Sequence, residues 1–193
     1  MTAVDSAQSA APTPPAAPAM TREELEELIR EGVPLVGSFG IVVDSLGAGT
    51  IRLRLPYKDD FVRPGGTVTG PAMFGLADVA LYGAVLSLIG RVELAVTTSM
   101  TINFLRRPPP VAIIAEARVL KLGKRLAYGE ILLFSEGDPE PVAHVTGTYS
   151  IPRTTPFPSR YLITAWMGRH KSLFYIKGLG GAVSNYLDRN ILI

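Results

Sequence analysis

Cysteine is absent from the 193-residue chain, and histidine occurs only twice, as His144 and His170. Without cysteine the chain can form no disulfide framework, no thiolate nucleophile and no cysteine-based metal site. Two imidazoles are too few for the usual zinc ligand sets, and they argue against a histidine-dependent catalytic triad. The sequence therefore implies no metal and no redox cofactor.

An excess of charge of one sign is also lacking, since 19 Lys and Arg face 17 Asp and Glu, for a formal net charge of +2. This balance does not predict a nucleic-acid partner, so any anion binding must come from local clusters. With 47% hydrophobic residues, a chain of this length can bury the core of one domain and carry extensions.

The two ends differ from the middle in composition. Residues 1–20 are rich in Ala, Pro and Ser and lack the basic start and apolar core of a signal peptide. We expect a disordered leader there, with Met20 as an alternative start, and a cytoplasmic protein. Residues 21–153 are the predicted folded domain. Residues 154–193 are an apolar, moderately basic extension to which the sequence assigns no role.

Periodic patterns predict the order of the elements. Thr21 and Glu24 match a capping box, followed by a helical apolar stripe that Gly32 and Pro34 end. Alternation in residues 51–55, after the turn sequence LGAG, predicts a hairpin or a bent strand pair. Later strand patterns, separated by turn and breaker sequences, predict an antiparallel meander; they cover residues 94–105, 112–122, 125–137 and 141–151.

Between these groups lies the apolar run TGPAMFGLADVALYGAVLSLIG, residues 69–90, whose one formal charge is Asp78. About 20 apolar residues would span a bilayer, but a central carboxylate is costly there. Four glycines and the lack of a basic N-terminal flank also argue against a span. A sheet curled around one helix lets that helix be hydrophobic nearly all round. We therefore predict an α+β fold, one antiparallel sheet wrapped around one long central helix.

The start of this helix and its acid suggest chemistry. Pro71 suits the first helical position, which puts Gly70 at an N-terminus whose free N–H groups can polarise a carbonyl. Asp78 follows at roughly 12 Å along the helix, so one acyl carbon cannot reach both groups of the same helix. Two antiparallel helices across a two-fold axis would bring Asp78 of one chain to Gly70 of the other. The sequence thus predicts a homodimer with two shared sites.

The block RPGGTVTGPAMFGLADVALYGAVL, with TTSMTINFLRR and AEARVLKLGKRLAYGEILLFSEGDPEPVAHVTGTYSI behind it, resembles the PaaI-type hotdog-fold acyl-CoA thioesterases over about residues 36–152. The resemblance implies a hotdog fold that hydrolyses an acyl- or aryl-CoA thioester as a dimer or tetramer. It places the family's catalytic acid at Asp78, as nucleophile or as general base for water, and its carbonyl-polarising N–H at Gly70. A purely structural role for Asp78, as a hydrogen-bonding group at the dimer interface, is the alternative.

Three positions depart from the family pattern Asn-Pro-x-Gly-x-Val-His-Gly-Gly. Arg63 stands in place of the Asn, Thr69 in place of the His and Pro71 in place of the second Gly. Because the family His is thought to orient the thioester or water, an acyl-CoA-binding protein without turnover is the main alternative function. Arg63 could bind a carboxylate or phosphate in bidentate geometry, or it could be a solvated loop residue.

Strand alternation predicts that Val96, Thr98, Met100, Ile102 and Phe104 face the helix, with Thr97, Ser99, Thr101 and Asn103 on the other side. Similar proteins use a hydroxyl near the start of this strand, which nominates Thr97 or Thr98. Both residues are also ordinary strand formers.

Basic residues at strand ends would suit the phosphates of coenzyme A. The candidates are Lys121, Lys124 and Arg125. A solvated hairpin turn explains Lys121 and Lys124 equally well. His144 is interpreted as a structural strand residue. A hotdog dehydratase is a further alternative, but such enzymes pair a His with an acid, and His144 lies far from the motif in sequence.

Overall fold

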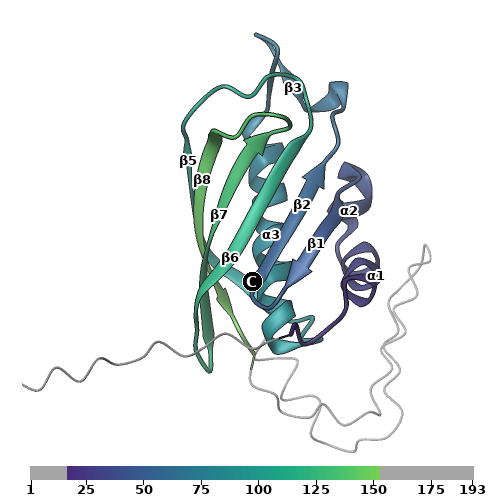
Figure 1. Cartoon of the computed structure of the whole chain (residues 1–193), viewed down its shortest axis with the longest axis vertical. Helices are drawn as coiled ribbons and strands as arrows, with labels where there is room; N and C mark the ends of the chain where they lie inside the picture. Colours follow the sequence, from purple (N-terminus) through teal and green to yellow (C-terminus); the bar gives the residue numbers. More distant parts are fainter. Residues whose placement is uncertain (1–16, 153–193) are drawn as a thin grey trace, which may run out of the picture. The chain divides into compact units, whose positions relative to one another are not determined.

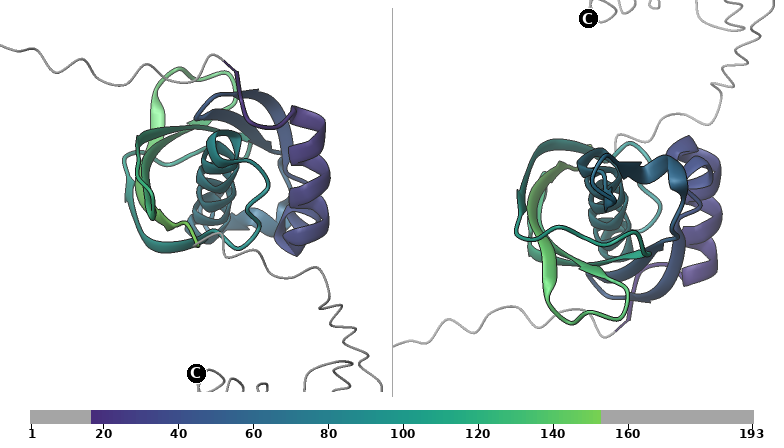
Figure 2. Two further views of the ribbon diagram at one scale, coloured as in Figure 1. Left: turned by 90° about the horizontal axis from the view of Figure 1, so that it is seen from below. Right: turned by 90° about the horizontal axis from the view of Figure 1, so that it is seen from above.

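Helix α3 (Gly70–Ile89) lies inside the curve of a six-stranded antiparallel sheet (Figure 1). The structure is a computed structural model and describes residues 17–152. Figure 2 looks along α3 and shows the sheet bending around it, with the N-terminal helices outside. The other elements are α1 (Arg22–Gly32), α2 (Pro34–Phe39), β1 (Val42–Gly47), β2 (Thr50–Leu55), the 3-10 turn η1 (Asp59–Phe61), β3 (Val62–Arg63), β4 (Thr67–Val68), β5 (Val96–Phe104), β6 (Ile113–Leu122), β7 (Leu126–Ser135) and β8 (Pro141–Ser150).

Helix α3 is apolar on nearly every side because the sheet covers most of it. Thirteen of its twenty residues are buried. The sheet approaches closely at two glycines: a Cβ on Gly129 or Gly147 would lie 2.5 or 2.7 Å from the side chain of Leu81. By length and composition alone α3 could cross a membrane. Its burial within the sheet makes it a core helix, so the predicted architecture is confirmed.

The N-terminal helix begins as the sequence predicts. Thr21 Oγ1 accepts a 3.1 Å hydrogen bond from Glu24 N–H, and a Glu24 carboxylate oxygen accepts one from Thr21 N–H at 2.8 Å. The following apolar stripe is buried. Pro34, however, does not end helical structure; it begins α2, where its missing N–H costs nothing.

The predicted leader extends too far into the folded domain. Ala19 N–H donates a 2.7 Å hydrogen bond to the carbonyl of Ser87, and Met20 is buried in the core. The domain therefore includes Ala19 and Met20. The rest of the leader prediction, up to residue 16, and the extension prediction for residues 154–193 lie outside the described residues.

The late strands do not form the simple meander that their order suggests. The sheet order is β1-β2-β6-β7-β8-β5, so β5 pairs with β8 while β6 lies between β2 and β7. The connection from β5 to β6 contains Pro108, Pro109 and Pro110, whose missing N–H groups cannot close a tight hairpin. The connection instead crosses the β7–β8 pair, so that β6 joins the sheet beside β7 and β5 is left at the edge beside β8.

A β-bulge between Thr97 and Ser99 changes which side chains of β5 face the helix. Thr97 pairs with the inward-facing Tyr149, whereas Val96 pairs with Ser150 on the outer face. The prediction for the inner face was therefore correct for Met100, Ile102 and Phe104. It was wrong for Val96, which faces outward, and for Thr98, which occupies the bulge, whereas Thr97 faces inward. One extra residue in a strand reverses the alternation on one side of it.

Candidate functional site

Asp78 lies half-buried on the third turn of α3, facing the start of β5 and the end of β8. Its Oδ1 atom accepts a 2.6 Å hydrogen bond from Thr97 Oγ1 and a 2.7 Å hydrogen bond from the Tyr149 hydroxyl. Within residues 17–152, no side chain donates to Oδ2. A carboxylate in an apolar helix is costly unless it is paired or used, and here one of its oxygens is paired.

Tyr149 is the site residue that the sequence does not reveal. In the alternating pattern of β8, Tyr149 is an inward-facing residue like any other. Only the fold brings it to Asp78, which lies 71 positions earlier in the chain. Burial raises the pKa of the Tyr149 hydroxyl well above its usual value, and the charge of Asp78 adds to this effect. The hydroxyl therefore stays protonated and acts as a donor.

Thr97, rather than Thr98, reaches Asp78. Thr98 occupies the bulge, and its hydroxyl donates instead to the carbonyl of Thr148 at 3.1 Å. Both threonines remain candidates from the sequence, but the geometry gives only Thr97 a contact with the acid.

Thr69 and Gly70 lie at the N-terminal end of α3, and Arg63 lies on the β3–β4 hairpin that leads into this end. Gly70 is the first helical residue, and its N–H has no acceptor within the helix. Thr69 precedes it as the N-cap but makes no side-chain capping hydrogen bond. Arg63 is exposed on β3. The ring of Phe104 lies beside Gly70, with more than half of its surface exposed. This end thus combines a backbone N–H without an acceptor in the helix, a cation on the adjoining hairpin and an exposed aromatic ring.

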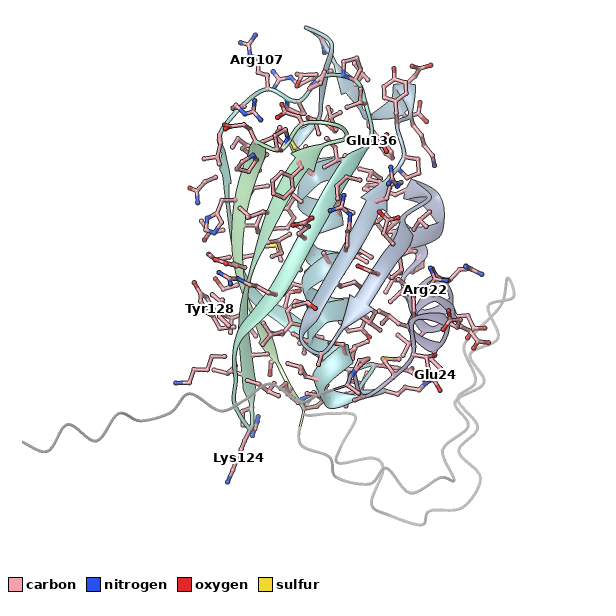
Figure 3. All side chains as sticks on the ribbon, in the orientation of Figure 1. Arg22, Glu24, Arg107, Lys124, Tyr128 and Glu136 are labelled. Atoms are coloured by element: carbon pink, nitrogen blue, oxygen red, sulfur yellow. The ribbon has the colours of Figure 1, made fainter. Side chains whose placement is uncertain are left out.

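The remaining predicted phosphate ligands lie elsewhere. Lys121, Lys124 and Arg125 are exposed around the β6–β7 hairpin. Figure 3 shows Lys124 at the end of the molecule opposite Arg107, which follows β5. Within one chain, the hairpin cations are therefore remote from Arg63 and Gly70.

The predicted site is divided into two halves along one helix. Gly70 and Asp78 both belong to α3, eight positions apart, as the sequence predicts. One half holds Gly70 with Thr69 and Arg63; the other holds Asp78 with Thr97 and Tyr149. A single chain does not bring the two halves onto one substrate atom.

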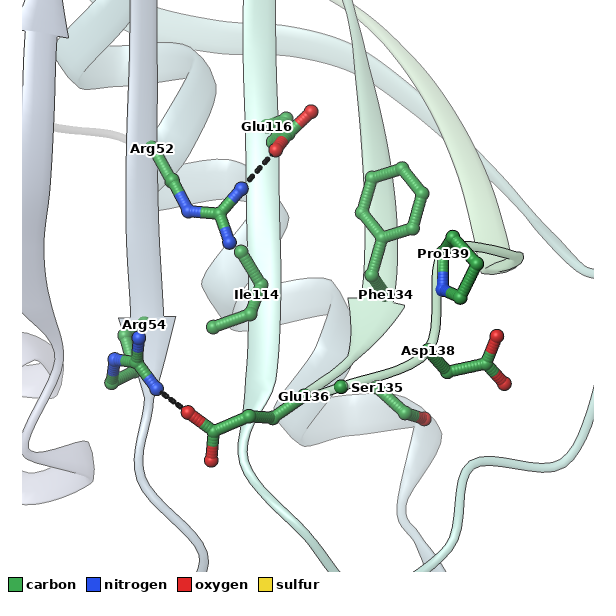
Figure 4. A pocket seen from close by; sticks show the side chains of 10 residues that line it. Arg52, Arg54, Ile114, Glu116, Phe134, Ser135, Glu136, Asp138 and Pro139 are labelled. Carbon is green, nitrogen blue, oxygen red and sulfur yellow. Dashed lines mark hydrogen bonds and ion pairs between the residues drawn. The ribbon is translucent and has the colours of Figure 1, made fainter.

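A separate cavity of about 500 Å³ lies on the outer face of the sheet (Figure 4). Arg52 and Arg54 line it, and they form ion pairs with Glu116 and Glu136, respectively. Because these guanidinium groups already have carboxylate partners, the cavity is a poor anion site. Neither half of the predicted site contributes to its lining. No group of three or more His, Asp or Glu side chains that could hold a metal ion occurs in residues 17–152.

An antiparallel sheet curled around one long helix is the architecture of the hotdog class of proteins. The family model of the Thioesterase superfamily matches residues 65–142. A Saccharolobus solfataricus protein whose name assigns it to the esterases is 30% identical over 138 residues, which cover 72% of this chain and 90% of that protein. The chain belongs to the Thioesterase superfamily.

Solved structures agree with this assignment. A crystal structure from a Silicibacter species, named as a thioesterase, is 45% identical, covers 71% of this chain and 95% of its own, and superimposes with a TM-score of 0.65. The phenylacetic acid degradation protein PaaI of Thermus thermophilus is 27% identical, covers 62% of this chain and 99% of its own, and gives a TM-score of 0.56. The resemblance to PaaI-type hotdog proteins is therefore confirmed.

Proposed function

We propose that this protein is a homodimeric acyl-CoA thioesterase that hydrolyses an acyl- or aryl-CoA thioester to the free acid and CoA. Asp78 acts as base or nucleophile, and the Gly70 N–H of the partner subunit polarises the thioester carbonyl. The observation that carries the proposal is the carboxylate of Asp78, held by two hydroxyls on one oxygen and open on the other. Membership of the Thioesterase superfamily supports it.

Two routes are compatible with this arrangement. As a base, Asp78 takes a proton from water while the water oxygen bonds to the acyl carbon; the C–S bond then breaks and the thiolate receives the proton. As a nucleophile, the carboxylate bonds to the acyl carbon and the thiolate leaves; water then cleaves the resulting anhydride to the free acid and the Asp78 carboxylate, and the thiolate takes up a proton. In both routes charge develops on the carbonyl oxygen, where a helix N-terminus stabilises it.

The position of β5 supports a dimer. This nine-residue strand ends the sheet order, so one side of its backbone has no strand partner in the described chain. Such an edge favours pairing with another chain. Pairing with the same edge of a second copy, antiparallel about a two-fold axis, would carry Asp78 of one chain toward Gly70 of its partner. Further association of dimers into a tetramer is compatible with this arrangement.

The same pairing would unite the basic residues. Arg63 lies at one end of the chain, and Lys121, Lys124 and Arg125 lie at the hairpin end. In an antiparallel dimer, the hairpin of one chain approaches the Arg63 end of the other. The phosphates of CoA would then have cations from both subunits.

A binding protein without turnover is the second candidate, and Thr69 is the observation that favours it. Thr69 stands where the family carries its His, and its side chain makes no capping hydrogen bond that would explain its presence. Acyl-CoA could then occupy the site and remain intact.

Thiol release from short, medium, long and aryl acyl-CoAs tests the proposal, with Asp78→Asn beside the parent. Asp78→Asn should lower the rate by about 10²- to 10⁴-fold, the usual contribution of a base. Asp44→Asn is the matched control, because Asp44 lies on β1 and pairs with Arg52 and Arg54; it should keep full activity. Saturable binding of acyl-CoA without thiol release would establish the binding protein instead.

A further inference from the structure

The two carboxylate oxygens of Asp78 have different surroundings. Oδ1 accepts both short hydrogen bonds, from Thr97 and from Tyr149. Oδ2 receives none from the described residues. The two donors occupy the lone pairs of Oδ1, so this oxygen is not free to react. They also fix the plane of the carboxylate, so Oδ2 points in one direction.

Tyr149 is the more deeply buried of the two donors. Only 3% of it is exposed, and its ring stacks on Tyr82 with the ring centroids 5.9 Å apart. Its oxygen also lies 3.1 Å from the backbone carbonyl of Asp78. Thr97 lies on the edge strand β5 and is exposed in the single chain. Tyr149 is thus the donor to Asp78 that burial within one chain already holds in place.

We propose that Tyr149 is a positioning residue that, together with Thr97, holds Oδ1 so that Oδ2 is the oxygen that reacts with water or with the acyl carbon. This inference rests on the proposed thioesterase function and adds to it a residue and a specific reacting atom. Tyr149 does not touch the substrate; it acts through Asp78.

A tyrosine with only a structural role would pack in the same way as Tyr149. The control residue must therefore have similar packing but no hydrogen bond to Asp78. Tyr82 provides that control: its ring is the other member of the stacked pair, and its hydroxyl donates to the carbonyl of Glu93 at 3.1 Å. Tyr82→Phe and Tyr149→Phe each remove one buried hydroxyl from the same pair of rings. Only the second removes a hydrogen bond to Asp78.

The experiment compares kcat and KM for thioester hydrolysis by the parent, Tyr149→Phe, Tyr82→Phe, Thr97→Val and the double variant Thr97→Val with Tyr149→Phe. Circular dichroism and thermal melting confirm that each variant folds. We expect Tyr149→Phe to lower kcat by about 10- to 100-fold, as for loss of a hydrogen bond to a charged group. KM should change by about twofold or less, because the substrate contacts remain. The double variant should fall further, and Tyr82→Phe should match the parent.

Each result decides the matter. Equal kcat in Tyr149→Phe and Tyr82→Phe, in a protein whose hydrolysis depends on Asp78, would overturn the positioning role and leave the thioesterase in place. A rise in KM with unchanged kcat would also overturn it, because it would show a role in binding. Absence of thiol release from every acyl-CoA with the parent would overturn the proposed function and this inference together.

Discussion

The ring of Phe104 closes against Gly70: a Cβ on Gly70 would lie 3.0 Å from Phe104 Cζ. Phe104 is the last residue of β5 and Gly70 the first of α3, so the contact joins the edge strand to the helix N-terminus. Because Gly70 has no side chain, the partly exposed ring of Phe104 can pack directly against its backbone. Phe104 therefore occupies the space that a side chain at position 70 would need. The backbone conformation itself does not require glycine, since the φ of Gly70 is not positive.

Gly70→Ala should impair turnover without destabilising the fold. The added methyl pushes against Phe104 and narrows access to the N–H, while alanine is at least as good a helix former as glycine. We expect kcat/KM to fall by about tenfold, or about 1.4 kcal/mol of transition-state stabilisation. Gly32→Ala, at the end of α1 with no atom within 4 Å of the new Cβ, is the control. Equal kinetics for the two variants would show that Gly70 has no role.

Mixing two defective subunits should restore activity if the site is shared. In a heterodimer of Asp78→Asn and Gly70→Ala chains, one site receives the intact Asp78 and the intact Gly70, and the other receives both substitutions. After unfolding and refolding an equal mixture, about half of the dimers are mixed, and activity should approach about a quarter of the parent's. Activity that equals the sum of the separately refolded variants would place the whole site within one chain.

Arg118→Gln should weaken the fold near neutral pH but not in acid. The hydrogen bond from Arg118 holds the pKa of Glu130 below its ordinary value, burial opposes this in part, and His144 adds to the lowering. A lowered folded-state pKa stabilises the fold above the ordinary pKa, and this stability is lost as the pH falls through the folded value. Because Arg118 is well exposed, the loss near pH 7 should be small, about 0.2–1 kcal/mol.

Thermal melting of the parent and Arg118→Gln at about pH 7 and about pH 3 checks this expectation. The two melting temperatures should differ at the higher pH and converge at the lower one. Glu130→Gln supplies the control, because adding Arg118→Gln to it should change nothing further. A difference that persists in acid would mean that Arg118 stabilises the fold through packing.

Local signals in the sequence predicted most of the fold. The capping box of Thr21 and Glu24, the hairpin turn at LGAG and the apolar run around Asp78 each depend on neighbours within a few positions, and each was confirmed. The pairing of β5 with β8 was not predicted, because strand partners depend on which edges remain free after the other strands have paired. Helix α2 was missed because Pro34 can begin a helix as well as end one.

The candidate site, like the fold, could be predicted only in part from the sequence. Asp78 stands out as the one charge in an apolar run, and Gly70 as a glycine before a helix-starting proline. Tyr149 carries no such signal, since a tyrosine at an inward-facing strand position usually reports burial alone. Its contact with Asp78 arises from the sheet order, which places the end of β8 next to the start of β5.

The bulge in β5 also affects how this chain is compared with its relatives. Two residues, Thr97 and Thr98, occupy a stretch in which an unbulged strand would have one. An alignment to a relative with a regular strand therefore needs a one-residue gap here. Without the gap, Thr98 would be matched to the relative's inward-facing residue, and the hydroxyl that contacts Asp78 would be assigned to the wrong threonine.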